Sequence, residues 1–182
     1  MRKRPDITDT TKNNLKEAFW KLYETRGINQ ISVKNITDMA GYNRGTFYLY
    51  YRNVNHILEQ IENEMLNDAD EYFGLVRESL RDMHIQDLMK FVFTLYGKHC
   101  KYVKVLFSEH GDPKFEIKWK NKVKTFLRQY FEKNLKDKGL QAEYLLEFYV
   151  SGLLGVEKMW FDNEQDLPFE DLVNLMYGVM FK

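Results

Sequence analysis

The stretch SVKNITDMAGYNRGTFYLYYR, residues 32–52, contains two short helical patterns that meet at one glycine. Ser32 is a candidate cap for the first pattern, in which apolar residues recur at spacings of three and four. Gly41 can adopt the positive backbone angle that ends such a helix, and Asn43 can cap the second helix. In that second helix Phe47 and one of the tyrosines at positions 50 and 51 would face inward. This layout predicts a helix-turn-helix, whose second helix can enter a DNA major groove.

The outward residues of the second helix have side chains that suit contact with DNA. Arg44 can donate two hydrogen bonds to a guanine edge, and Thr46 can bond a base or touch a thymine methyl group. Gly45 lets the backbone lie close to the duplex. Phosphates on either side could be held by three longer side chains that carry donors: Lys34, Tyr48 and Tyr50. The alternative is an ordinary helical hairpin with an aromatic-rich surface.

Over roughly residues 10–66 the sequence resembles the TetR/AcrR family of bacterial transcriptional regulators. The matching segments are ISVKNI at residues 31–36 and AGYNRGTFY at residues 40–48. The resemblance implies a three-helix DNA-binding head whose third helix reads the operator. It implies that Ser32 and Lys34 contact the DNA backbone and that Arg44, Thr46 and Tyr48 lie in the groove. It also implies that Asn43 caps the reading helix and that Tyr50 flanks it.

One position departs from the family pattern. Val54 stands where many members carry a lysine that binds a phosphate. Either Arg52 or His56 replaces that contact, or the contact is missing.

Charge is distributed unevenly along a chain of 182 residues whose formal net charge is zero. Residues 1–58 hold ten Lys and Arg against five Asp and Glu, so this part is +5 and the remainder must be −5. A basic head on an acidic body is typical of a DNA-binding module attached to a module with another task. We expect a DNA-binding domain at 1–52 and an effector-binding and dimerisation domain at 53–182, joined through a helix that starts near residue 53.

The body reads as helix throughout, because the sequence beyond residue 80 has no clean period-2 runs. Gly111-Asp112-Pro113 is a helix start, with the aspartate as cap and the proline at the first helical position. The helix that follows is expected to stop at Gly139. The predicted fold is therefore all-α, with a helix-turn-helix head, a helical body and about nine helices in total.

Residues 141–162 are apolar on nearly every side of a helix, so that helix must be buried on every side. The segment after Pro168 repeats this pattern. One side of each helix could face the protein's own core and another side a second subunit with two-fold symmetry. The predicted interface residues are Gly152, Leu153, Gly155, Val156, Trp160, Leu172, Met176 and Val179. The alternative is that both helices only complete the core of a monomer.

Aromatic residues make up 15% of the chain, and many lie beyond residue 90. Small molecules bind in largely apolar pockets between helices, and the resemblance implies an inducer pocket among the middle helices. The candidates to line it are Tyr96, His99, Cys100, Phe107, Trp119, Phe126, Phe148 and Tyr149. The alternative for each residue is a place in the ordinary core.

Metal sites and enzymatic sites are disfavoured. The four histidines, at 56, 84, 99 and 110, lack the paired spacing of structural zinc sites. The sequence has no Gly-rich phosphate loop and no G-x-S-x-G elbow. His99 and Cys100 are neighbours, and neighbouring side chains on a helix point about 100° apart, so they would not act as a pair. We expect no metal, no cofactor and no enzymatic activity.

The cellular context follows from the same residues. One cysteine excludes an internal disulfide and is typical of a reducing cytosol. No apolar segment after the basic residues 2–4 resembles a signal peptide, and no run reaches the roughly 20 apolar residues that span a bilayer. The chain is expected to be cytoplasmic, without a membrane partner.

The resemblance implies a regulator that binds a palindromic operator as a homodimer and is released by a small-molecule inducer. Repression is the commoner behaviour in the family, and activation would use the same parts. The competing class is a helical protein-interaction module without DNA binding. That alternative predicts no salt-dependent affinity for DNA, whereas a head that grips phosphates loses affinity steeply as salt rises.

Overall fold

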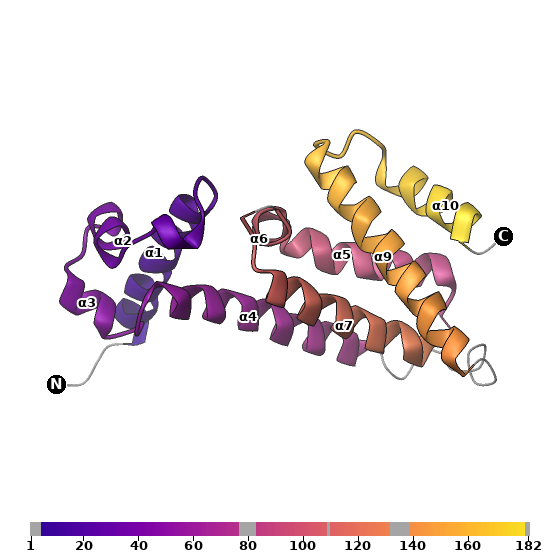
Figure 1. Ribbon diagram of the computed structural model, residues 1–182, viewed down its shortest axis with the longest axis horizontal. Coiled ribbons are helices and arrows are strands. Elements are labelled where there is room, and N and C mark those ends of the chain that lie inside the picture. Colours follow the sequence, from indigo (N-terminus) through magenta and orange to yellow (C-terminus); the bar gives the residue numbers. More distant parts are fainter. Residues whose placement is uncertain (1–4, 77–82, 109, 132–138, 181–182) are drawn as a thin grey trace. The chain divides into compact units, whose positions relative to one another are not determined.

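The computed structural model describes residues 5–76, 83–108, 110–131 and 139–180, and its regular elements in these ranges are all helices. The all-α prediction with about nine helices is confirmed, because the described residues form nine α-helices (Figure 1). They are α1 Pro5–Tyr23, α2 Val33–Ala40, α3 Arg44–Tyr48, α4 Val54–Leu75, α5 Ile85–Lys98, α6 Cys100–Leu106, α7 Pro113–Tyr130, α9 Leu140–Asp162 and α10 Phe169–Met180, with a 3-10 turn at Ile28–Gln30. Within the described ranges, no helix is both long enough and apolar enough to cross a membrane.

Two compact units divide the chain. The first contains residues 1–64 together with 109–111, and the second contains residues 65–108 and 112–182. The division falls inside α4, which gives its first part to one unit and its second part to the other. The predicted domain boundary between residues 52 and 53 stays a prediction.

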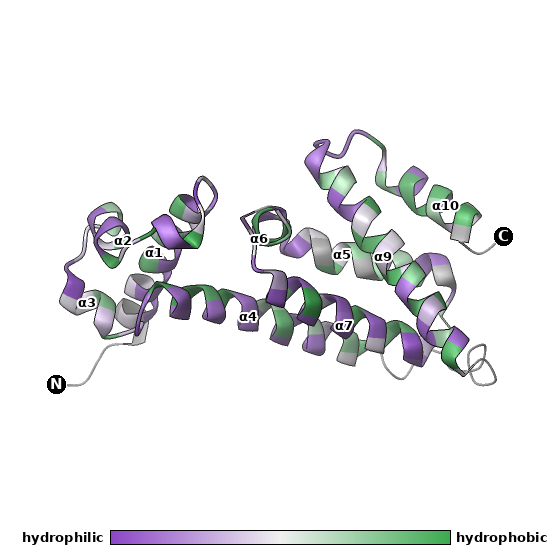
Figure 2. Ribbon diagram, viewed as in Figure 1, coloured by the Kyte–Doolittle hydropathy of each residue, from purple (hydrophilic) through white to green (hydrophobic). Residues whose placement is uncertain are grey.

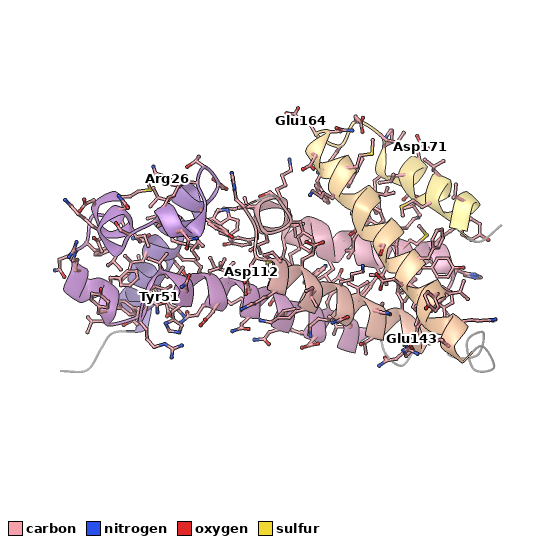
Figure 3. The ribbon with its side chains drawn as sticks, in the orientation of Figure 1. Arg26, Tyr51, Asp112, Glu143, Glu164 and Asp171 are labelled. Atoms are coloured by element: carbon pink, nitrogen blue, oxygen red, sulfur yellow. The ribbon has the colours of Figure 1, made fainter. Side chains whose placement is uncertain are left out.

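The first unit, called the head below, has an aromatic core. Phe19, Tyr23, Phe47 and Tyr51 are each at most 1% exposed, and the rings of Phe19 and Tyr23 stack with centroids 5.4 Å apart. The Tyr51 hydroxyl donates a hydrogen bond to the carbonyl oxygen of Lys12 at 3.2 Å, which ties the segment after α3 to α1. Burial, with a smaller contribution from the nearby Glu64 carboxylate, raises the pKa of this hydroxyl. Tyr51 is therefore a neutral donor, and its position in the head is labelled in Figure 3.

In the second unit, called the body below, α7 begins as the sequence predicts. Asp112 accepts a hydrogen bond from the Lys114 amide at 2.8 Å, and Pro113 occupies the first turn. The helix ends at Tyr130 and not at Gly139, so that prediction was wrong. The chain leaves helical geometry at Phe131, whose ring packs on Tyr149 with centroids 5.6 Å apart.

Ion pairs join α7 to α9. Lys120 pairs with Glu147, Arg128 pairs with Glu143, and Lys124 lies within 3.5 Å of both carboxylates. The hydrogen bond from Arg128 lowers the pKa of Glu143, and the hydrogen bond from Lys120 lowers the pKa of Glu147. Glu143 is labelled near the start of α9 in Figure 3. Because these pairs are solvent-exposed, each stabilises the fold only slightly, and their main effect is to fix how α7 aligns with α9.

Candidate functional site

The helix-turn-helix begins with a reciprocal cap on α2. The Ser32 hydroxyl oxygen accepts from the Asn35 amide at 3.2 Å, and the Asn35 side-chain oxygen accepts from the Ser32 amide at 3.0 Å. This satisfies two of the backbone donors that a helix start leaves free. The cap predicted at Ser32 is confirmed, while Asn35 was missed because the usual partner at that spacing is Glu or Gln.

The turn between α2 and α3 has the geometry that the sequence predicts. Gly41 has φ 73° and ψ 29°, the left-handed conformation that favours glycine, and its amide donates to the Thr37 carbonyl. The hydroxyl of Tyr42 accepts a hydrogen bond from the Asn14 side chain at 3.0 Å, which joins the turn to α1. The direction of α3 is thus set by contacts inside the head.

Asn43 caps α3 through its side-chain oxygen. This oxygen accepts from the Thr46 amide at 2.8 Å and lies 3.2 Å from the Thr46 hydroxyl, which can donate to it as well. A Cβ on Gly45 would approach the same oxygen at 3.1 Å, so the absence of a side chain there leaves room for the cap. The predicted cap is confirmed.

The side chains of α3 separate into an inner and an outer set, as predicted. Phe47 is fully buried, while Arg44, Gly45 and Tyr48 are exposed and Thr46 is partly exposed. Of the two tyrosines that could face inward, Tyr51 does so and Tyr50 stays partly exposed.

Leu49, which ends α3, was missed by sequence reasoning, although it is 63% exposed. It belongs to an apolar-aromatic run in which one leucine is not distinguishable from a core residue. As the C-cap residue of α3, it adds an apolar side chain next to the exposed residues of that helix.

Three basic side chains flank α3. Lys34 on α2 is exposed. The Arg52 side chain is 77% exposed, and its guanidinium lies 3.7 Å from the Glu59 carboxylate. His56 is engaged in the start of α4, because its Nδ1 accepts from the Arg52 amide at 3.1 Å while its own amide donates to Asn53 at 2.9 Å. Of the two basic residues that the sequence offers beside Val54, Arg52 is the more exposed and His56 is engaged in local hydrogen bonds.

The predicted pocket residues do not share one environment. His99, Phe107, Trp119 and Phe126 are buried, and Tyr149 is half-buried. The side chains of Tyr96 and Cys100 lie outside the described part of the structure. Phe148 is 65% exposed and cannot line the interior of one subunit, so that assignment is corrected.

Two members of this set have informative surroundings. Burial lowers the pKa of His99, although its Nε2 lies 3.2 Å from the Asp68 carboxylate, which acts in the opposite direction. Phe126 stacks on Phe73 with centroids 4.1 Å apart, at the base of an open groove of about 440 Å³ between α4 and α7. The rim of that groove includes Lys118, Lys122 and Asp70.

A stripe of exposed apolar and small residues runs along α9, and we call it the α9 stripe. Successive members are three or four positions apart and therefore share one helix face. They are Leu140, Tyr144, Phe148, Gly152, Gly155 and Met159, and each is exposed. On α10, Leu175 and Val179 are also exposed, by 58% and 76%.

The predicted dimer residues divide between this surface and the core. Gly152, Gly155 and Val179 are exposed, and Val156 and Trp160 are half-buried. Leu153, Leu172 and Met176 are at most 5% exposed within a single chain, so we reassign them to the core of the body. The sequence pattern placed them at an interface because it cannot separate burial inside a subunit from burial between subunits.

Comparison with known proteins gives consistent matches. Residues 83–182 match the family model TetR_C_8, described as a transcriptional regulator C-terminal region. The HTH-type dhaKLM operon transcriptional activator DhaS of Lactococcus lactis is 28% identical over 137 residues, which cover 66% of this chain and 72% of the relative.

Solved structures show the same fold. A TetR transcriptional regulator from Streptococcus agalactiae has a TM-score of 0.65 at 17% identity, covering 97% of both chains. The regulator FadR from Bacillus subtilis, in complex with stearoyl-CoA, has a TM-score of 0.61 at 16% identity, covering 92% of this chain and 96% of that one.

Proposed function

We propose that this chain, which belongs to the TetR family of transcriptional regulators, binds a palindromic DNA operator as a homodimer. In this proposal, the affinity of the dimer for the operator changes when a small molecule binds the body. The observation that carries the DNA contact is the capped helix α3, which presents Arg44, Gly45 and Tyr48 to solvent while Phe47 anchors it in the head. Two such helices in a dimer would occupy major grooves about 34–36 Å apart, one turn of DNA. In this proposal the protein is a cytoplasmic regulator and not an enzyme.

Each residue of the proposed DNA interface has a distinct task. Arg44 reads a guanine edge and Thr46 contacts a neighbouring base. Lys34, Tyr48, Tyr50 and Arg52 hold phosphates, and the Ser32 and Asn43 side chains support the two helix starts. His56 is proposed to act through its bond to the Arg52 amide, which positions the arginine.

The α9 stripe is the surface on which we propose that two subunits meet. Exposed apolar residues that follow one helix face mark an interaction site, and a self-complementary patch suits two-fold symmetry. Gly152 and Gly155 lie in the middle of the stripe, where their missing side chains would allow two helices to approach closely.

The effector and the direction of regulation complete the proposal. The solved FadR complex shows that a protein of this fold can hold a small molecule. We propose repression, which is the commoner behaviour implied by the resemblance. Activation is the second candidate, and the relative named as an activator favours it.

The test is to incubate the purified protein with random or genomic DNA fragments and sequence those that it retains. The expected result is a short inverted repeat, with affinity that falls steeply as salt rises, because each phosphate contact releases a counterion. Retention of no sequence, even in dilute buffer, would leave the helical protein-interaction module as the correct reading.

Replacing Phe148 with glutamate should disrupt the proposed dimer. A charge in the middle of an apolar contact must be desolvated, and we expect the dimer dissociation constant to rise at least about tenfold. Sedimentation velocity over a concentration series measures this. The matched control is Ile117→Glu, because Ile117 is also an exposed apolar residue, 60% exposed on α7, but lies outside the stripe. Equal dimerisation of the two variants would exclude the α9 stripe as the interface.

A further inference from the structure

A second cavity of the body has four aromatic rings among its seven lining residues. It has a volume of about 310 Å³ and lies between α5, the end of α9 and the start of α10. We call its four rings the aromatic box: Phe93 from α5, Trp160 and Phe161 from α9, and Phe169 from α10. The other lining residues, Thr94, Gly97 and Gln165, are uncharged.

Three rings of the box come from three helices and meet edge to face or at a tilt, with interplanar angles of 70° for Phe93–Trp160, 66° for Phe93–Phe169 and 37° for Trp160–Phe169. The centroid of Phe93 lies 6.2 Å from that of Trp160 and 5.6 Å from that of Phe169, and Trp160 and Phe169 are 5.9 Å apart. Phe93 and Phe161 are nearly fully buried, whereas Trp160 and Phe169 are partly exposed. The box therefore combines two buried rings with two partly exposed rings.

The turn between α9 and α10 fixes the accessible side of the box. The Trp160 indole N–H donates to the Leu167 carbonyl at 2.7 Å, and the Gln165 amide donates to the Trp160 carbonyl at 2.8 Å. Gln165 adopts φ 63°, a left-handed conformation in which the turn brings its side chain to the cavity. These bonds hold the tryptophan ring in place before any ligand arrives.

The surroundings of the box are acidic. Residues 162–171 contain Asp162, Glu164, Asp166, Glu170 and Asp171, and no Lys, Arg or His. Glu170 pairs with Lys90 at 2.8 Å, and none of the other four carboxylates has an ion-pair partner among the described residues. Figure 3 labels Glu164 and Asp171 at this turn, and Figure 2 shows hydrophilic residues at the end of α9 beside a largely hydrophobic α10. The turn thus gives the mouth of an uncharged cavity a negative potential.

A buried carboxyl group lies one helical turn before Phe161 on α9. Glu157 is four residues before Phe161 and therefore on the same face of α9. It is 0% exposed, and neither of its carboxyl oxygens has a hydrogen-bond partner among the described residues. Burial raises its pKa well above the ordinary value. A positive charge held in the box would favour the ionised form of this group.

We propose that the aromatic box binds a small organic cation of the quaternary or methylated ammonium type. Aromatic ring faces attract such cations through their quadrupole, and several rings around one methylated nitrogen form the usual site for them. An uncharged lining suits a diffuse cation that cannot donate hydrogen bonds, and the acidic turn raises its local concentration. The inference rests on the proposed function only for the ligand's role as effector, since binding itself involves no DNA.

The experiment compares a cation with its neutral carbon isostere. The full chain, without DNA, is titrated calorimetrically with choline and, separately, with 3,3-dimethylbutan-1-ol, in which carbon replaces the charged nitrogen. Benzyltrimethylammonium serves as a second cation. We expect both cations to bind, and the alcohol to bind at least about fivefold more weakly than choline, as a cation–π contribution predicts. Equal binding of choline and the alcohol would identify a merely apolar cavity, and no binding of either cation at millimolar concentration would overturn the proposal.

Variants locate the site. Phe169→Leu keeps an apolar side chain but removes a ring face, and should weaken cation binding about fivefold. Phe91→Leu is the matched control on α5, because Phe91 stacks on Tyr72 and does not line the box, and it should bind the cation normally. Circular dichroism checks that both variants fold. Loss of binding in both variants would place the cation elsewhere.

Two further readouts keep this inference separate from the proposed function. If Phe169→Leu lowers dimer content while the unaltered protein binds no cation, the box is a subunit contact and the proposal fails. Operator affinity is measured on the same samples without cation. A protein that binds the operator but no cation would retain the proposed DNA-binding function and refute only the ligand class.

Discussion

Replacing Arg44 with alanine should weaken binding to the retained inverted repeat by about 1–3 kcal/mol, or roughly 5- to 150-fold. The guanidinium is exposed on the first residue of α3, where it can form two hydrogen bonds to one guanine. Its removal should therefore also relax the preference at a single base pair of each half-site. Fluorescence anisotropy titrations against the operator and against every single-base variant measure both effects. Because the side chain is exposed, the melting temperature should not change.

Lys34→Ala is the matched control for that experiment. Lys34 is exposed on α2 and is proposed to contact a phosphate, so its loss should weaken all sequences similarly and reduce the slope of log affinity against log salt by about one. The pattern of losses is therefore diagnostic. Equal and sequence-independent losses from both substitutions would show that α3 does not read the bases.

Replacing Glu157 with leucine should raise the stability of the protein, and more so at higher pH. The folded pKa of this carboxyl is raised above its unfolded value, so the folded state holds its proton more tightly. Stability from this group is fully present below the unfolded pKa and is lost as pH rises toward the folded pKa. Leucine removes that loss and fills a similar volume.

The expected gain at pH 8 is about 1–3 kcal/mol, the typical cost of a buried polar group without a partner. For a chain of this size that corresponds to roughly 2–4 °C per kcal/mol in melting temperature. Thermal unfolding is followed at pH 5 and pH 8 at one protein concentration, because dimerisation would also shift the midpoint. The difference in melting temperature between Glu157→Leu and the unaltered protein should be larger at pH 8 than at pH 5.

Glu157→Gln separates charge from burial. The amide cannot ionise, so the contribution of residue 157 to the pH dependence of the melting temperature should disappear. The amide still leaves buried polar atoms without partners, so this variant should gain less stability than Glu157→Leu. A lower melting temperature for Glu157→Leu at pH 8 would mean that the carboxylate has a favourable partner in solution.

The head was largely predictable from its sequence because its structure depends on local signals. Ser32, Gly41 and Asn43 each act within a few residues, and the structure finds the two caps and the left-handed glycine where the pattern placed them. Asp112 and Pro113 start α7 for the same reason. Signals of this kind depend on backbone geometry and need no knowledge of distant packing.

The body was less predictable because its surfaces depend on tertiary packing. The apolar run of α9 does not tell which side faces the core. Phe148 was therefore assigned to a pocket although it is exposed, and Leu153 was assigned to the subunit interface although it is buried within one chain. Glu157 was passed over as one acid in an apolar helix, and only the structure shows that it is enclosed without a partner. The end of α7 at Tyr130 had no glycine or proline to mark it.

Under the proposed DNA-binding function, the Asn43 cap limits how the preference for an operator can evolve. The same oxygen that holds the Thr46 amide also lies within hydrogen-bonding distance of the Thr46 hydroxyl. While that hydroxyl donates to Asn43, Thr46 can offer DNA only an acceptor oxygen and its methyl group, and the methyl group suits thymine. A mutation at Asn43 would free the proton of the Thr46 hydroxyl and, at the same time, weaken the start of α3. Lineages of this regulator would therefore change their target sequence more readily through Arg44, whose exposed side chain can vary without loosening the helix that carries it.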